Sequence, residues 1–131
     1  MPFGPEFILM TLKLFNNVLI IGVGLIGSSI ARALQKNSLA DKIMGYNTDP
    51  IVKEKCTKLK IIDGFIDSIA NNGHHFDIII ICSPLGTYKD IFSSLNDEVK
   101  DQCIVTDVGS TKLSVIKDFE DICKNEHISL V

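Results

Sequence analysis

The 131-residue chain has no long apolar run, no excess of positive charge and no closely spaced pair of cysteines. No segment reaches the roughly 18 apolar residues of a transmembrane helix, so we expect no membrane span. Its 13 basic and 16 acidic residues give a formal charge of −3. No cluster of Lys and Arg interrupts that balance, which argues against nucleic-acid binding.

The cysteines are too few and too widely spaced for a disulfide scaffold or a C-x-x-C metal site. They are Cys56, Cys82, Cys103 and Cys123. We expect reduced thiols in a cytoplasmic protein. His74 and His75 are adjacent, and adjacent side chains rarely converge on one ion, so the sequence predicts no metal site.

A chain of this length forms one domain and buries roughly two-thirds of its unfolded surface. Residues 1–9 carry Pro2, Gly4 and Pro5 and differ from the rest, so we interpret them as a disordered or vector-derived tail. Residues 10–131 form the predicted domain. No Lys or Arg precedes Lys13, which argues against a secretory signal.

The strongest positive signal lies at residues 18–27. Four apolar residues, Val18–Ile21, lead directly into the pattern Gly22-x-Gly24-x-x-Gly27. In this context Gly22 allows a tight turn, Gly24 lets phosphates approach the backbone, and Gly27 lets a helix pack close to the sheet. The free N–H groups and the helix dipole then face a pyrophosphate. The structural alternative is a tight turn with no ligand.

Strand and helix patterns alternate along the chain. They predict an α/β fold, Rossmann-type and doubly wound, with a mainly parallel sheet of about six strands in a single domain. We expect strands at 18–21, 42–46, within 61–66, 76–82, 103–107 and 127–131. We expect helices at 25–36, from Pro50 with Asp49 as cap, from Asp67 to about 73, at 88–95 and at 112–125.

The helical segments carry apolar stripes, of which the first and the last are the longest. In the first the expected inward residues are Ile26, Ile30, Ala33 and Leu34. In the last they are Leu113, Ile116, Phe119, Glu120 and Cys123, widened by Val115 and Ile122.

Ligands of open α/β sheets bind beyond the carboxyl ends of the strands, where four loops of this chain are expected. The predicted cofactor contacts in these loops are Gly22, Gly24, Leu25, Ile26, Gly27, Asn47, Thr48, Ser83, Pro84, Thr87, Asp107 and Gly109. Among the side chains there, Ser110 and Lys112 are the most reactive. A helix cap, a solvated charge and a loop brace are the structural alternatives for Ser110, Lys112 and Asp107 respectively.

Asn47 follows the expected second strand, about 20 residues after Gly27. At this position an acidic residue would bind the adenosine ribose, and a nearby Arg would bind a 2′-phosphate. This chain has neither. An amide can still hydrogen-bond a ribose hydroxyl, and Asp49 would repel a phosphate, so we predict NAD as the cofactor, with NADP second. His127 lies at the amino end of a strand, away from these loops, and is not expected to be catalytic.

Several blocks resemble the start of prephenate and arogenate dehydrogenases, in matching order from about Asn17 to Val131. They are residues 18–34, Gly45-Tyr46-Asn47, Ile62-Asp63, residues 81–86 and, most distinctively, residues 104–112 with the sequence IVTDVGSTK. The resemblance implies an NAD(P)-dependent enzyme of tyrosine biosynthesis that oxidatively decarboxylates prephenate or arogenate. It also implies that Ser110 is catalytic, lying between nicotinamide and substrate.

The chain departs from this family at Asn47, where an acidic residue is usual, and at Val131, where it ends. The family's catalytic histidine, in a Gly-His-Pro segment, and its helical dimerisation domain would follow. We therefore expect a nucleotide-binding domain with little activity alone, from an enzyme that is a homodimer when complete. The alternatives are another Rossmann reductase, of β-hydroxyacid or imine type, and a non-catalytic dinucleotide-sensing module.

Overall fold

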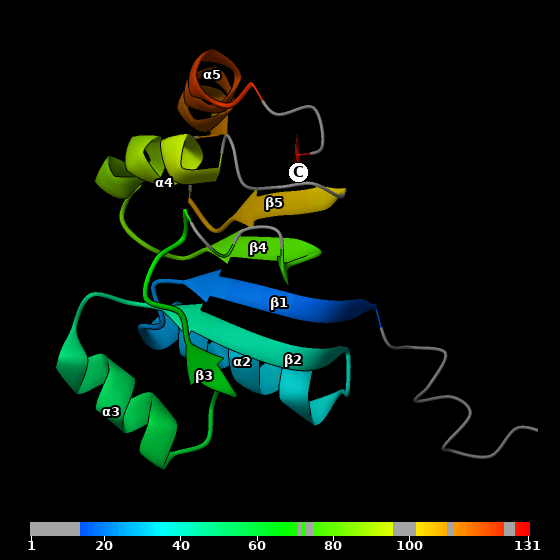
Figure 1. Ribbon diagram of the computed structural model, residues 1–131, viewed down its shortest axis with the longest axis vertical. Helices are drawn as coiled ribbons and strands as arrows, with labels where there is room; N and C mark the ends of the chain where they lie inside the picture. Colours follow the sequence, from blue (N-terminus) through cyan, green and yellow to red (C-terminus); the bar gives the residue numbers. More distant parts are fainter. Residues whose placement is uncertain (1–13, 71, 73–74, 96–101, 110–111, 125–127) are drawn as a thin grey trace, which may run out of the picture.

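The computed structural model describes residues 14–70, 72, 75–95, 102–109, 112–124 and 128–131 (Figure 1). Six parallel strands form one sheet in the order β3-β2-β1-β4-β5-β6. The strands are β1 (Phe15–Ile21), β2 (Ala40–Tyr46), β3 (Gly64–Phe65), β4 (Ile78–Ile81), β5 (Cys103–Asp107) and β6 (Ile128–Leu130). The helices are α2 (Leu25–Lys36), α3 (Pro50–Lys58), the 3₁₀ turn η2 (Leu85–Thr87), α4 (Tyr88–Leu95) and α5 (Lys112–Ile122). The predicted fold class is confirmed.

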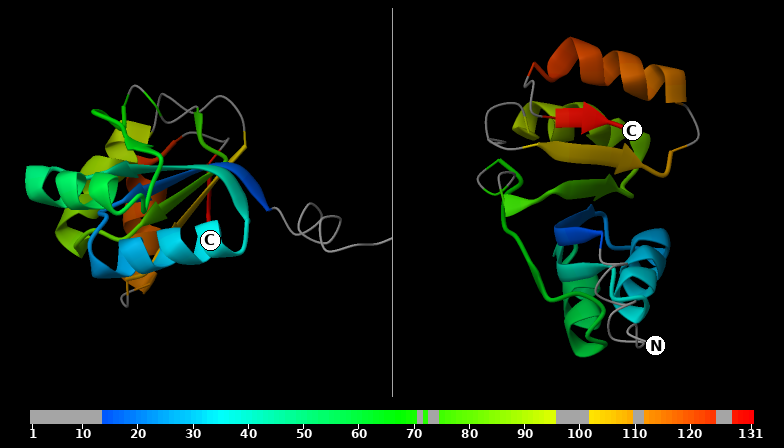
Figure 2. Two further views of the ribbon diagram at one scale, coloured as in Figure 1. Left: turned by 90° about the horizontal axis from the view of Figure 1, so that it is seen from below. Right: turned by 90° about the vertical axis from the view of Figure 1, so that its right-hand side faces the viewer.

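The core divides between the two faces of the sheet because alternate residues of β1 point in opposite directions. Val18 and Ile20 pack in one cluster with Leu34 of α2. Leu19 and Ile21 pack in the other, which includes residues of α4 and α5. Figure 2 shows α2 on one face and the chain between β3 and β4 passing over the opposite face. The strand order reverses at β1, between β2 and β4.

The buried stripe of α2 differs from the predicted one. Gly27, Ala31 and Leu34 are buried, whereas Ile26 is 54% exposed and Ala33 is also exposed. Gly27 sets this rotation, because a Cβ there would lie 2.5 Å from the carbonyl oxygen of Gly22. Close approach at a glycine, rather than the largest apolar side chains, therefore fixes which face meets the sheet.

The stripe predicted for α5 is also partly wrong. Leu113 is 86% exposed, and Ile116 and Glu120 are exposed as well. Val115 and Cys123 are buried, with Phe119 and Ile122 packed against the core. Phe119 is held by Phe92 of α4, with ring centroids 5.3 Å apart at 85°, an edge-to-face pair of the kind that adds roughly 1 kcal/mol.

The short helix predicted from Asp67 is wrong, because residues 67–70 form bends and a turn. Ile66 and Ile69 are buried against the core, so their helix-like spacing reflects a loop pressed on the sheet. The third strand starts at Gly64. Just before it, Asp63 N donates to Ile43 O at 2.8 Å, and the carboxylate of Asp63 accepts a hydrogen bond from Ile43 N at 2.7 Å. Within the described ranges, every helix is too short or too polar to span a bilayer.

Candidate functional site

The loop after β1 lies against the loop after β4, backbone to backbone. Gly22 adopts φ +86°, and a Cβ there would be 2.8 Å from Ser83 N. Only glycine fits both the conformation and the space. This contact lies where the sheet order reverses, which is where open α/β sheets form their ligand crevice.

Gly24 is the N-cap of α2 and makes no side-chain cap. A Cβ built on it meets no described protein atom within 4 Å. The first amides of a helix have no acceptor within it, so this end of α2 can donate to an anion placed beside Gly24. The open space is therefore suited to a phosphate group.

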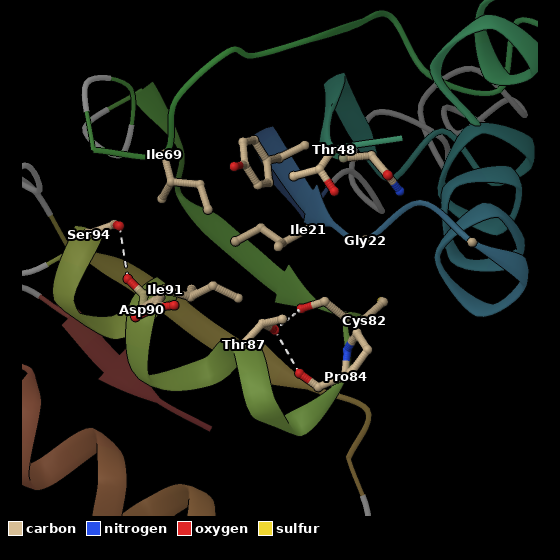
Figure 3. A pocket seen from close by; sticks show the side chains of 14 residues that line it. Ile21, Gly22, Thr48, Ile69, Cys82, Pro84, Thr87, Asp90, Ile91 and Ser94 are labelled. Atoms are coloured by element: carbon tan, nitrogen blue, oxygen red, sulfur yellow. Dashed lines mark hydrogen bonds between the residues drawn. The ribbon is translucent and has the colours of Figure 1, made fainter. Parts of the chain in front are cut away.

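Gly24 also lines a pocket of about 490 Å³ at the carboxyl ends of β1, β2 and β4 (Figure 3). One end is formed by the glycine loop and the loop after β4, the other by α4 and the chain after β3. The lining residues are Ile21, Gly22, Gly24, Tyr46, Asn47, Thr48, Ile69, Cys82, Ser83, Pro84, Thr87, Asp90, Ile91 and Ser94.

Asn47 is fixed by a turn into α3. Its Oδ1 accepts a hydrogen bond from Asp49 N at 2.9 Å, and Asp49 Oδ1 accepts one from Ile51 N at 2.9 Å. The expected cap by Asp49 is thus present. The carbonyl oxygen of Asn47 already accepts one hydrogen bond in this turn, and its N–H₂ group is a donor for a ligand, which a carboxylate could not provide.

The loop after β4 is held by its own hydroxyl groups. Thr87 Oγ1 donates to Pro84 O at 2.7 Å, so the hydroxyl of Ser83, 2.7 Å from Thr87 Oγ1, is the donor in that pair. Ser83 therefore presents oxygen lone pairs, and not a proton, to a ligand. Nearby, burial raises the pKa of the Cys82 thiol to about 11, which keeps it protonated and a poor nucleophile at neutral pH.

Asp107 and Gly109 are not among the residues that line the pocket. Oδ2 of Asp107 accepts hydrogen bonds from Gly109 N at 2.9 Å and from Tyr88 Oη at 3.2 Å. Burial, helped by the charge of Asp107, raises the pKa of Tyr88 to about 12, so its hydroxyl stays a donor. This geometry makes Asp107 a brace of the β5–α5 loop.

Seven of the predicted contact residues line the pocket: Gly22, Gly24, Asn47, Thr48, Ser83, Pro84 and Thr87. Leu25 and Ile26 are exposed at the start of α2, and Gly27 is buried beneath them. Ser110, Thr111, His74 and His127 lie outside the described residues, as does the side chain of Lys112.

Sequence reasoning missed the end of the pocket near α4. Tyr46, Ile69, Asp90, Ile91 and Ser94 line it. Thr87, Asp90, Ile91 and Ser94 follow helical spacing, and that pattern could have shown a second face on α4. No comparable signal marks Ile69, which a loop brings to the site.

The family model described as "Prephenate dehydrogenase, nucleotide-binding domain" matches residues 30–130. The chain belongs to this family. The resemblance read from the sequence is confirmed, although the match begins after the glycine loop. The block at residues 104–112, the most distinctive part of the resemblance, lies within the matched range.

Individual relatives agree with the family match. A cyclohexadienyl dehydrogenase of Zymomonas mobilis is 30% identical over 117 residues, which is 89% of this chain and 40% of that protein. A prephenate dehydrogenase of Bacillus subtilis is 32% identical over 81% of this chain and 29% of that protein. The chain thus spans 40% or less of the length of these relatives.

Solved structures show the same arrangement. The structure of prephenate dehydrogenase from Aquifex aeolicus with hydroxyphenyl propionate and NAD+ matches with a TM-score of 0.75 and 34% identity, over 88% of this chain and 40% of that one. A Synechocystis arogenate dehydrogenase matches with a TM-score of 0.72 at 22% identity, over 82% of this chain and 38% of that one, a likeness of fold alone.

Proposed function

We propose that this chain binds NAD+ as the nucleotide-binding domain of a prephenate or arogenate dehydrogenase. The observation that carries the proposal is the open space beside Gly24, at the N-terminus of α2 and continuous with the 490 Å³ pocket. A Cβ at residue 24 would enter that space without coming within 4 Å of a described protein atom. The space therefore fits a phosphate that approaches the backbone, as in other dinucleotide-binding folds.

The described residues fit the cofactor along the pocket. The amides at the start of α2 would hold the pyrophosphate, and the N–H₂ group of Asn47 would donate to an oxygen of the adenosine ribose. No Lys or Arg is among the described residues that line the pocket, whereas Asp90 is. A 2′-phosphate would meet no cation there, which favours NAD over NADP.

For the whole protein we propose oxidative decarboxylation of prephenate or arogenate. Bound NAD+ supplies the hydride acceptor. Loss of carbon dioxide then makes the ring aromatic, giving 4-hydroxyphenylpyruvate or tyrosine, with NADH as the reduced product. Ser110 would lie between cofactor and substrate, as the family resemblance implies, while residues 10–131 form the nucleotide-binding domain and residues 1–9 a tail.

To enclose a substrate, the site needs residues in addition to those that the structure describes. A half-open nucleotide site neither excludes water nor fixes a second reactant. We propose that a helical domain completes the site in a homodimer, and that the 131-residue chain alone turns over little or no substrate. Its free cysteines suit a reducing compartment such as the cytoplasm.

Isothermal titration of the 131-residue chain with NAD+ tests the proposal. We expect saturable binding, and we expect Gly24→Ala to weaken it at least tenfold while leaving the unfolding temperature nearly unchanged. Lys89→Ala, an exposed change on α4 that is outside the pocket lining, is the control and should bind as the unmodified chain does. No binding by the unmodified chain, or equal binding by Gly24→Ala, would contradict the proposed function.

A further inference from the structure

Helix α4 packs in the core with one face and lines the pocket with another. Tyr88, Phe92 and Leu95 are buried in the core below it. Asp90, Ile91 and Ser94 line the pocket, as Figure 3 shows, and Ile91 belongs to the core cluster as well. The proposed phosphate contacts lie at the glycine loop, and the proposed ribose contact lies at the end of β2. Neither part of a dinucleotide would therefore contact this second face of α4.

The pocket near this face has apolar walls. Ile91 and Ile69 are 5% and 6% exposed and contribute aliphatic walls, together with Ile21 at the end of β1. With the pyrophosphate at Gly24 and the ribose at Asn47, the base of the adenosine half extends to this remaining end. Aliphatic walls can cover both faces of a purine and leave its polar edge uncovered.

Among the described residues that line the pocket, Asp90 is the charged one. No hydrogen bond or ion pair of its carboxylate is present among the described residues. The neighbouring Ser94 hydroxyl is already committed, since it donates to the backbone oxygen of Asp90 at 2.9 Å. An ionised carboxylate only accepts hydrogen bonds, so it suits a base that presents a donor and disfavours one that presents a carbonyl.

We propose that the carboxylate of Asp90 accepts a hydrogen bond from the exocyclic 6-amino group of adenine and so selects adenine over a 6-oxo purine. This assignment rests on the proposed function, because it requires the dinucleotide to bind in this pocket. It makes Asp90 a residue that determines base specificity. Asp90 also lies in the first turn of α4, where an acidic side chain favours the helix dipole, so stability alone does not test the assignment.

The test compares NAD+ with nicotinamide hypoxanthine dinucleotide, in which a carbonyl replaces the 6-amino group. Isothermal titration of the 131-residue chain should show NAD+ binding about tenfold more tightly, the lower end of the range for one hydrogen bond to a charged group. Asp90→Ala should weaken NAD+ by about the same factor and bring the ratio of the two dissociation constants close to one.

Asp90→Asn separates base recognition from a general loss of binding. Its amide can donate to the 6-carbonyl, so this variant should bind the hypoxanthine dinucleotide more tightly than the unmodified chain does. Asp121→Asn removes the same charge from an exposed position on α5 and should change neither affinity.

The outcomes are distinguishable. An unmodified chain that binds neither dinucleotide would overturn the proposed function and the assignment with it. If NAD+ binds but the ratio is unchanged in both Asp90 variants, or if both dinucleotides weaken equally in Asp90→Ala without a gain in Asp90→Asn, the assignment is overturned and the proposed function stands.

Discussion

The hydroxyl of Tyr88, the first residue of α4, donates to Oδ2 of Asp107, the last residue of β5, at 3.2 Å. The same oxygen accepts from Gly109 N at 2.9 Å. One carboxylate oxygen therefore connects the start of α4, whose outer face lines the pocket, to the loop that leads into α5. The position of that loop depends on a buried side chain from another element.

Replacing Tyr88 by Phe removes only the hydroxyl and should lower the free energy of unfolding by about 1–2 kcal/mol at neutral pH. The loss is moderate because Asp107 keeps its bond to Gly109. Urea unfolding at pH 7 measures it. Tyr46→Phe, which removes a hydroxyl from a half-buried ring, is the matched control. An unchanged free energy for Tyr88→Phe would contradict the brace.

The stability difference between the unmodified chain and Tyr88→Phe should shrink above about pH 10. The pKa of Tyr88 is raised from 10.0 to about 12 in the folded chain, so the unfolded chain releases this proton first as the pH rises. The contribution is complete below pH 10 and is lost as the pH rises from 10 to 12. Unfolding measured at several alkaline pH values checks the sign. A difference that grows in this window would contradict it.

The three glycines of the loop should separate into structural and ligand-facing positions. Gly22→Ala forces a Cβ to within 2.8 Å of Ser83 N at φ +86°, and Gly27→Ala brings one to 2.5 Å from Gly22 O. Each should cost on the order of 1–3 kcal/mol of stability, because backbone must move. Gly24→Ala meets no protein atom and serves as the matched control in thermal unfolding. Equal destabilisation by all three would contradict the separation.

The sequence was enough to predict elements that depend on local chemistry. Asp49-Pro50 begins α3, and the run of isoleucines forms β4 in the centre of the sheet. It was not enough to predict which face of a helix is buried, because tertiary contacts determine that. Ile26 of α2 and Leu113 of α5 fit an apolar period, yet both are exposed, since close approach at Gly27 and the Phe92–Phe119 pair set the rotation of these helices.

In the site, too, the residues that follow readable strands could be predicted, and those placed by tertiary contacts could not. Gly22, Gly24 and Asn47 could be placed because the strand that precedes each of them is readable and parallel strands end at one edge. Ile69 could not, because the spacing of Ile66 and Ile69 predicted a short helix where the structure has a loop packed against the core. The donor character of Asn47 could not be predicted either, as it depends on the hydrogen bond from Asp49 N to its carbonyl.

Ser110→Ala in the complete enzyme should lower turnover at least a hundredfold and change the dissociation constant of NAD+ by less than about threefold. A group between cofactor and substrate acts on the reaction, whereas a helix cap acts on folding. Steady-state kinetics with prephenate or arogenate and titration with NAD+ measure the two effects. Comparable losses in both would mean that Ser110 is only a cap, and Ser114→Ala, an exposed change on α5, is the control.

Replacing Asn47 by Asp should sharpen the preference for NAD+ over NADP+. The new carboxylate keeps one oxygen for Asp49 N, as Asn47 does now, and adds a second oxygen that accepts from ribose hydroxyls. Its charge repels a 2′-phosphate. We expect NAD+ to bind a few-fold more tightly and the ratio of the NADP+ and NAD+ dissociation constants to rise about tenfold, the range of about one charge-assisted hydrogen bond. Isothermal titration of the 131-residue chain measures both, with Asn16→Asp, at the amino end of β1, as the isosteric control. A ratio that falls, or that rises equally in the control, would show that Asn47 does not contact the ribose.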